Sequence, residues 1–460
     1  MCSSALLTSV RKGSGLKPAD IAKHALATGT ALAVIVTAVP ASAQRVAGDD
    51  PPIAQSGITT VSAVNGRGWR IEGSLRTLFD DNLLRLPEGS ALNGRDKADF
   101  RISPAVSGAI GLPVGRQQLF LGALYGRDFY VRNSELNRNR IVVGGGLAWR
   151  VGVSCSGTIA AEYRRRQNLF SDQSVLVDNV QATKTYGANG DCQAPVGLGF
   201  GGSINRTETE NKNPNRRAFD STTMTYSPRL SYGSSALGRF NVSGTLTKVD
   251  YPQRTVPTPN GVQSDGVDIM SGRFGYSRAL GTRFNLSLGA SYIKTKPQPK
   301  TVLQLVPVGG GLFQVAAVDR AGYSGLGYDA SLSYTPSPRL SAQFSASRDV
   351  SSTANVGALF VLNQSYGIDL GYRLGPSIST GLGATFFKRS YRGSFPSQTE
   401  TVARISDKTS RFYARVGYSP VKLYDLDLEV AHQKRRSNPD DFNFSGTSAS
   451  LTLRVKFGRT

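Results

Sequence analysis

The segments of this chain that read as β-strands are joined by connections whose lengths alternate along the sequence. From Gly68 onward, apolar and polar residues alternate over stretches long enough to cross a bilayer as tilted strands, which takes about 9–11 residues. Connections after even-numbered stretches are short, whereas several of those after odd-numbered stretches are long and polar. Short turns alternating with longer loops are typical of transmembrane β-barrels. A soluble β-sandwich has no reason to keep this order.

The pattern predicts about 18 strands, an even number, as in bacterial single-chain barrels. The expected strands are residues 68–79, 99–111, 117–130, 140–151, 156–167, 177–187, 194–207, 219–232, 238–250, 266–278, 282–295, 323–334, 339–348, 360–373, 377–391, 407–418, 423–436 and 445–457. The short connections are expected at residues 112–116, 152–155, 188–193, 233–237, 279–281, 335–338, 374–376 and 419–422. Longer loops are expected at residues 80–98, 208–218, 251–265, 296–322 and 392–406.

The last strand shows the alternation most clearly. Leu451, Leu453, Val455 and Phe457 share one face, while serine, threonine, arginine and lysine occupy the other. In lipid such a strand has to pair with the first one, because an open edge leaves backbone groups without hydrogen bonds. We therefore expect an all-β fold, a transmembrane antiparallel up-and-down β-barrel.

Aromatic residues recur just before the short connections. Amphipathic rings are favoured at membrane–water interfaces. We therefore expect an aromatic girdle at the periplasmic end, formed by Trp149, Tyr232, Tyr276, Tyr334, Tyr372 and Tyr418.

The N-terminal segment has the features of a secretory signal peptide. Four basic residues precede or border a short apolar run at residues 25–39, and Ala41-Ser42-Ala43 fits a cleavage site. We expect residues 1–43 to be removed between Ala43 and Gln44, residues 44–67 to form a flexible periplasmic arm, and residues 68–460 to form the barrel. The chain is then placed in the outer membrane of a Gram-negative cell.

The net charge favours anionic partners. The chain carries 54 Lys and Arg against 32 Asp and Glu, a net charge of +22, and loss of residues 1–43 leaves +19. Such a surplus suits outer-membrane lipid and lipopolysaccharide or an acidic glycan, and export argues against nucleic acid. As an outer-membrane barrel, the chain is also expected to meet the barrel assembly machinery.

Two cysteines follow the predicted cleavage site, Cys155 and Cys192. Because an exported chain enters an oxidising compartment, an even pair predicts one disulfide. The alternative is two unpaired thiols. Both are expected in periplasmic turns beside neighbouring strands.

The inward face of the predicted barrel is rich in arginine. Successive residues of a strand point to opposite faces, so odd or even position along a strand, which we call its parity, decides whether a residue points inward. Parity gives ten candidate lumen-lining residues: Arg70, Arg76, Arg101, Arg140, Arg164, Arg166, Arg273, Arg411, Arg415 and Arg454. Counting every inward position, fifteen basic residues are expected against seven acidic ones. Rings of Arg and Lys select anions in pores. The alternative is that Glu162, Asp425, Asp427 and Glu429 neutralise the arginines in a salt-bridge ladder that only stiffens the wall.

The sequence offers no support for catalysis or for a cofactor. His432 is the only histidine after the predicted cleavage site and falls on the outward face, with no serine and orienting group recognisable beside it. Too few His and Cys residues remain for a metal site built from them. We expect a protein that is not an enzyme and has no catalytic residues, metal or cofactor.

Several motifs resemble the putative beta-barrel porin 2 family. They are the stretch from Leu75 to Arg85 (LRTLFDDNLLR), Arg101 to Val106 (RISPAV), Leu119 to Tyr130 (LFLGALYGRDFY) and Asn137 to Arg140, all within residues 69–167. The resemblance implies an outer-membrane barrel associated with exopolysaccharide export, and therefore polysaccharide-export proteins as partners. The alternatives are a general or anion-preferring diffusion porin, and a barrel that acts through its extracellular loops.

Overall fold

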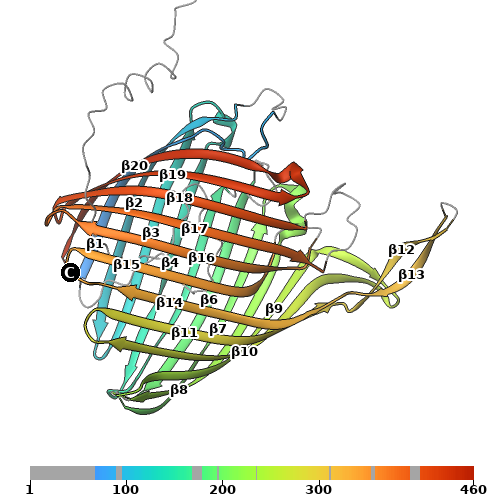
Figure 1. Cartoon of the computed structure of the whole chain (residues 1–460), viewed down its shortest axis with the longest axis horizontal. Helices are drawn as coiled ribbons and strands as arrows, with labels where there is room; N and C mark the ends of the chain where they lie inside the picture. The colour runs from blue at the N-terminus through green and yellow to red at the C-terminus, as the bar shows by residue number, and fades with distance from the viewer. Residues whose placement is uncertain are drawn as a thin grey trace, which may run out of the picture. The chain divides into compact units, whose positions relative to one another are not determined.

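The structure, a computed structural model, contains one closed sheet of 18 antiparallel strands and a separate two-stranded hairpin (Figure 1). It describes residues 68–89, 96–167, 179–193, 196–234, 236–309, 312–353, 358–393 and 405–459. The predicted signal peptide and periplasmic arm lie outside these residues. Among the described residues, no helix has the length and apolar character needed to cross a membrane. The all-β barrel predicted from the alternation is confirmed, with its 18 strands.

Each strand pairs with its neighbours in the chain, so the barrel is built by consecutive hairpins. The strands of the barrel are β1 (Gly68–Asp80), β2 (Asp99–Val114), β3 (Gln117–Tyr130), β4 (Arg138–Val151), β5 (Cys155–Gln167), β6 (Val180–Gln193), β7 (Gly197–Asn211), β8 (Ser221–Ser234), β9 (Gly238–Thr258), β10 (Gly261–Leu280), β11 (Phe284–Gln298), β14 (Tyr323–Tyr334), β15 (Leu340–Ser352), β16 (Phe360–Arg373), β17 (Ile378–Arg392), β18 (Ser406–Val421), β19 (Tyr424–Asn438) and β20 (Phe444–Arg459). The hairpin is formed by β12 (Thr301–Gly309) and β13 (Leu312–Asp319), and three short 3₁₀ turns are η1 (Ser134–Leu136), η3 (Pro214–Phe219) and η4 (Asp440–Phe442).

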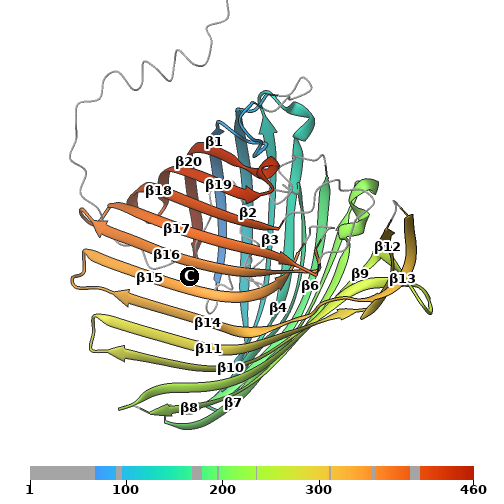
Figure 2. The same ribbon diagram turned by 45° about the vertical axis from the view of Figure 1, so that its right-hand side comes forward.

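The barrel closes where the first and last strands meet. β1 pairs with β20 in an unbroken antiparallel register from Trp69 opposite Arg459 to Asp80 opposite Ser448. Figure 2 shows the two strands side by side. Every barrel strand therefore has two partners, and the first and last strands leave no open edge toward lipid.

The two faces of the wall differ as the sequence predicts. On β20, Leu451, Leu453 and Phe457 are 42%, 40% and 51% exposed, because they point away from the barrel. The alternate residues Thr452, Arg454 and Lys456 point inward. Large exposed apolar side chains recur on the outer face of the other strands. This apolar outer face is the surface that lipid covers.

Aromatic side chains gather at the end of the barrel with short turns, as expected of the periplasmic interface. Tyr334 stacks on Phe284 with ring centroids 4.3 Å apart, and Tyr276 packs against Phe240 at 5.0 Å. The ring of Trp149 lies over Gly157: a Cβ at this glycine would come within 2.5 Å of it. Only glycine leaves room for the ring at this position.

Two predicted loops are β-structure. β9 and β10 continue to Thr258 and Gly261, through the region expected to be a loop at 251–265, with a register shift between Ser264 and Asp265. Residues 296–322 were also expected to be a loop, but contain the β12–β13 hairpin. Figure 1 shows both hairpins reaching beyond the neighbouring strands. We call residues 251–265 and 296–322 the extracellular extension.

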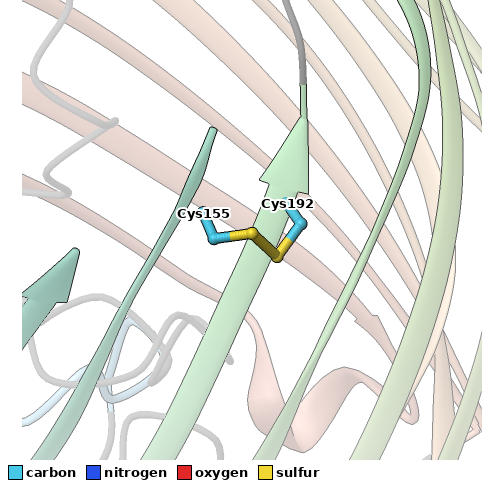
Figure 3. The surroundings of a disulfide bond; sticks show 2 residues. All are labelled: Cys155 and Cys192. Atoms are coloured by element: carbon cyan, nitrogen blue, oxygen red, sulfur yellow. A yellow bond between two sulfur atoms is a disulfide. The ribbon is translucent and has the colours of Figure 1, made fainter. Parts of the chain in front are cut away.

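The two cysteines form a disulfide bond (Figure 3). Cys155 begins β5 and lies directly opposite Cys192 on β6, with their Cα atoms 3.9 Å apart. The prediction that both lie in turns is wrong, because β6 runs on to Gln193 and its turn comes later. Both cysteines lie at the periplasmic end, where the short turns are.

Removing this disulfide is expected to lower barrel stability. It closes a segment of 37 residues, for which chain entropy predicts a contribution of up to about 4 kcal/mol. The double variant Cys155→Ser/Cys192→Ser should lose its folded gel mobility in detergent at a lower temperature than the parent. The single Ser156→Ala variant is the matched control. Equal transition temperatures for the double variant and the parent would show that the bond contributes nothing.

Candidate functional site

The inner wall of the barrel carries the predicted arginines. Arg70, for example, lies between Trp69 and Ile71, which are 46% and 47% exposed on the lipid side, so Arg70 itself points inward. The same parity places all ten candidates on the inner face: Arg70, Arg76, Arg101, Arg140, Arg164, Arg166, Arg273, Arg411, Arg415 and Arg454.

The seam formed by β18, β19 and β20 holds a column of ion pairs. Glu429 accepts a hydrogen bond from Arg411 at 2.7 Å, Asp427 pairs with Arg454, and Asp425 pairs with Lys456. Each of the three inward carboxylates on β19 thus pairs with a cation on a neighbouring strand, either β18 or β20. The predicted salt-bridge ladder is confirmed at these three carboxylates.

Three more candidates pair with carboxylates away from the seam. Arg140 lies 3.3 Å from Asp128, and Arg164 lies 2.8 Å from Glu162. Arg273 bridges two strands, because it binds Asp329 through two nitrogens and Asn241 through a third. The side chains of Arg140, Arg164, Arg273 and Arg454 nevertheless keep 27–33% of their surface exposed.

The inner wall contains more acid than the sequence suggested. Within the described residues, seven inward carboxylates were not among the seven expected: Asp80, Asp99, Asp128, Asp191, Asp265, Asp349 and Asp407. Most of them lie near strand ends. Some of these positions were predicted to be in loops, and the others were in predicted strands but were not assigned to the inner or the outer face. The predicted ratio of about two cations to one anion is therefore too high. Paired charges at close spacing are a better description of the wall than a field of unpaired arginines.

The first loop folds back over the closing seam. Arg85 pairs with Asp80 at 2.9 Å and its guanidinium lies over the ring of Phe444, 5.5 Å from the centroid. Asn82 donates to the carbonyl of Ser445 at 2.8 Å. The Asp-Asp-Asn-Leu-Leu-Arg sequence at residues 80–85 thus links the first strand to the last one.

At the extracellular mouth, one part of the barrel wall packs against the inside of another part. On β9, β10 and β11 the inward residues Val249, Val267 and Ile293 are almost completely buried, and they cluster with Val350 and Phe360. Parity places Val350 and Phe360 on the outer faces of β15 and β16. The inner face of β9, β10 and β11 can contact the outer face of β15 and β16 only if β15 and β16 lie on the lumen side of β9, β10 and β11 at this point.

Two polar contacts show the same arrangement. The Tyr251 hydroxyl on β9 donates to the carbonyl of Thr353, just after β15, at 2.9 Å. Arg348 donates to the Tyr323 hydroxyl at 3.1 Å. β14 and β15 are paired from Tyr328 opposite Arg348 to Tyr334 opposite Ala342, toward the periplasmic end. On the extracellular side of Tyr328 and Arg348 the two strands are not paired, so the wall is open between them. The tip of the β15–β16 hairpin therefore lies inside the upper part of β9–β14 and narrows the mouth.

Opening this overlap is expected to raise conductance. Phe360 is 1% exposed, and truncation of a buried phenylalanine typically costs about 3–5 kcal/mol. Phe360→Ala should release the hairpin tip and increase the single-channel conductance. Phe412→Ala removes a ring that is 50% exposed to lipid and serves as the control. Equal conductance for both variants would show that the overlap does not limit the pore.

The extracellular extension is fixed to the barrel by a buried charge cluster. Asp265 pairs with Arg254 at 2.6 Å and with Arg320 at 2.7 Å, and these three side chains are only 1–4% exposed. Arg254 also lies over the ring of Tyr251, 3.8 Å from its centroid. One carboxylate thus joins the long β9–β10 hairpin to the end of the segment that carries β12 and β13.

The β12–β13 hairpin itself is exposed and forms its own sheet. Leu305, Leu312 and Phe313 are 64%, 68% and 66% exposed. At its base the Lys300 ammonium and the Thr301 hydroxyl bind Asp319 and hold the pKa of that carboxyl below its usual range. Figures 1 and 2 both show the hairpin beyond the ends of the barrel strands, so these residues do not fill the lumen.

His432 has hydroxyl neighbours that sequence reasoning did not find. Its Nδ1 lies 3.0 Å from Thr447 Oγ1 and its Nε2 lies 3.5 Å from Ser445 Oγ, on the outer face of β19 and β20. The third group is a threonine, which cannot stabilise an imidazolium as the carboxylate of a Ser-His-Asp triad does. Cross-strand hydrogen bonding accounts for this group. Within the described residues, no three His, Cys, Asp or Glu side chains gather as metal ligands would.

A closed barrel with an apolar outer face and a charged inner face is an outer-membrane porin-like β-barrel, a pore in the outer membrane of a Gram-negative cell. The family described as putative beta-barrel porin 2 matches residues 317–457, from β13 into β20. The resemblance to this family is thereby confirmed. The match does not include residues 69–167, from which the resemblance was inferred. No curated protein matches the chain.

Solved porin structures are similar to this chain. A BenF-like porin from Pseudomonas fluorescens Pf-5 has a TM-score of 0.46 at 10% identity, with 85% of this chain and 99% of that chain covered. Pseudomonas aeruginosa OccK9 (OpdG) has a TM-score of 0.45 at 11% identity, with 85% and 98% covered. OpdK from Pseudomonas aeruginosa has a TM-score of 0.42 at 10% identity, with 85% and 99% covered.

Proposed function

We propose that this barrel is a pore through which an acidic polysaccharide crosses the outer membrane. The observation that carries this proposal is the partial exposure of the paired inward arginines. Arg140, Arg273 and Arg454 each pair with a carboxylate but keep 29–33% of their side-chain surface exposed. A guanidinium has five N–H donors, and a carboxylate occupies only some of them. The remaining donors supply many weak sites for anionic groups along the wall.

Weak and repeated sites suit a moving chain better than strong isolated ones. Conduction requires binding that is favourable enough for entry and weak enough for release. A neighbouring carboxylate lowers the affinity of each arginine for a uronate, so that successive sugars can exchange between sites. The likeness to the porin 2 family favours a polysaccharide as the anion, and polysaccharide-export proteins as partners.

Planar-bilayer recording tests this proposal. A soluble polyuronate is added to one side of a single reconstituted pore, with neutral dextran of equal length as the control. The polyuronate should produce transient current blocks whose frequency rises with its concentration and falls with salt, because screening weakens attraction. Dextran should block far less often. Equal block frequencies for the two polymers would contradict a role for the charged wall.

The second candidate is an anion-preferring diffusion porin, since the same exposed donors attract small anions. It predicts anion-selective current but no block by the polyuronate. A third candidate, a barrel that acts through its extracellular parts, is favoured by the exposed apolar side chains of β12 and β13. That candidate predicts no selective current at all.

A further inference from the structure

The outer face of the barrel carries cations at its extracellular end. Parity places them among the lipid-facing positions of nine strands, just beyond the apolar residues. They are Arg127, Arg165, Lys184, Arg206, Lys248, Lys294, Lys388, Lys408, Lys434 and Arg436. None of them was a candidate lumen residue.

Four cations crowd together on three adjacent strands. Lys388 on β17 lies directly opposite Lys408 on β18, and Lys408 lies directly opposite Arg436 on β19. Lys434 is the next outward residue below Arg436 on the same strand. All four are exposed. We call these residues the cation patch.

Like charges at directly opposed positions destabilise a sheet unless an anion lies between them. No ion pair joins the patch to a carboxylate of the described residues. Elsewhere on the outer face the chain provides its own partners: Lys184 pairs with Glu210 at 2.8 Å, and Arg206 pairs with Glu208 at 2.7 Å. The patch therefore differs from these two pairs, because four cations meet there and an anion that compensates them has to come from outside the described residues.

The surface just below the patch is apolar and aromatic. Phe386 is the next outward residue toward the periplasm from Lys388, and Phe412 follows Ser410 on the same face of β18; the two rings pack edge to face with centroids 5.7 Å apart. Both rings are about half exposed; His432 lies directly opposite Phe412 on β19, and Val430, the next outward residue toward the periplasm, is 44% exposed. A ligand that fits both surfaces has an anionic head toward the outside and a hydrocarbon part toward the membrane centre.

We propose that the cation patch binds the phosphate groups of a phosphorylated outer-leaflet lipid, whose acyl chains lie on Phe386, Phe412 and Val430. Lysine and arginine ammonium and guanidinium groups are the standard partners of phosphate. The position of the patch at the extracellular limit of the apolar surface is the height at which lipid phosphates lie. A soluble acidic glycan or free phosphate would use the cations but would gain nothing from the aromatic floor.

Native mass spectrometry of the detergent-solubilised protein tests this inference. The probe is lipid A with two phosphates, compared with lipid A from which both phosphates have been removed. The test variant is Lys388→Gln/Lys408→Gln/Lys434→Gln/Arg436→Gln. The control variant, Lys184→Gln/Glu210→Gln/Arg206→Gln/Glu208→Gln, changes four charged outer-face residues that satisfy one another. Each basic residue near an anionic surface contributes about fivefold to binding.

The parent and the control variant should bind diphosphorylated lipid A alike, and the test variant should bind it at least about tenfold more weakly. Dephosphorylated lipid A should bind weakly to all three. Unchanged binding by the test variant would overturn the proposal. So would displacement of the lipid by inorganic phosphate or a soluble polyuronate at concentrations equal to that of the lipid, since either result would assign the patch to a soluble anion. Heat-modifiable gel mobility verifies that each variant is folded.

Discussion

Replacing Arg70, Arg101, Arg140 and Arg273 with glutamine should shift the reversal potential of the pore toward cation preference. The expected shift is large because each change does more than remove a positive charge. Loss of Arg140 leaves Asp128 without its partner at 3.3 Å, and loss of Arg273 leaves Asp329 without its hydrogen-bonded guanidinium. The wall thus loses four cations and gains two uncompensated carboxylates. The shift should be greatest at low salt, where screening is weak.

The matched control removes the same charge from the other face. Arg127, Arg165, Lys248 and Lys294 lie on the outer face, and changing them to glutamine leaves the lumen untouched. Bilayer recordings under a salt gradient should give the parental reversal potential for this variant. If the two quadruple variants shift the potential equally, the total charge of the protein, and not the lumen, sets selectivity.

Asp265→Asn should loosen the extracellular extension while the barrel below stays folded. Asp265 is the carboxylate partner of two buried guanidiniums, and breaking a buried ion pair on one side typically costs about 3–5 kcal/mol. The neutral amide cannot compensate two cations. Limited proteolysis should therefore cut within residues 251–265 or 296–322 much faster than in the parent, and heat-modifiable mobility should be kept.

Asp319→Asn is the matched control for this experiment. Asp319 also pairs with a cation, Lys300, at 2.7 Å, but the two side chains are 56% and 74% exposed. Exposed pairs contribute little, about 0–1 kcal/mol. Rapid cleavage of the Asp319 variant, or slow cleavage of the Asp265 variant, would show that burial of the charge cluster does not hold the extension.

The barrel could be predicted from sequence because lipid imposes a rule on every strand. Positions such as Leu451 and Leu453 have to be apolar, since they face hydrocarbon, and their neighbours are free to be polar. The same rule placed the ten arginines on the inner face. Where strands leave the membrane the rule no longer applies, and there the predictions were wrong.

The extracellular extension is the clearest example. Residues 251–265 were expected to be a long loop, yet β9 runs through Pro252 and Pro257 to Thr258, and the pairing with β10 shifts register beside Asp265. Residues 302–306, with Gln304 as the only polar side chain, have no alternation to detect, because no lipid face orders that hairpin. The overlap of β15–β16 inside β9–β14 depends on contacts between residues far apart in the sequence, such as the hydrogen bond from Tyr251 to Thr353, 102 positions away, and the cluster shared by Val249 and Val350. Strand parity within one segment does not contain this information.

The reversal potential of the unmodified pore is the measurement that tests the central claim most directly. The claim is that inward arginines, although paired, make the outer-membrane pore favour anions. With potassium chloride at different concentrations on the two sides of a planar bilayer, the potential should have the sign of chloride preference and shrink as salt rises. A potential with the sign of potassium preference at low salt, from an open and folded pore, would contradict the account.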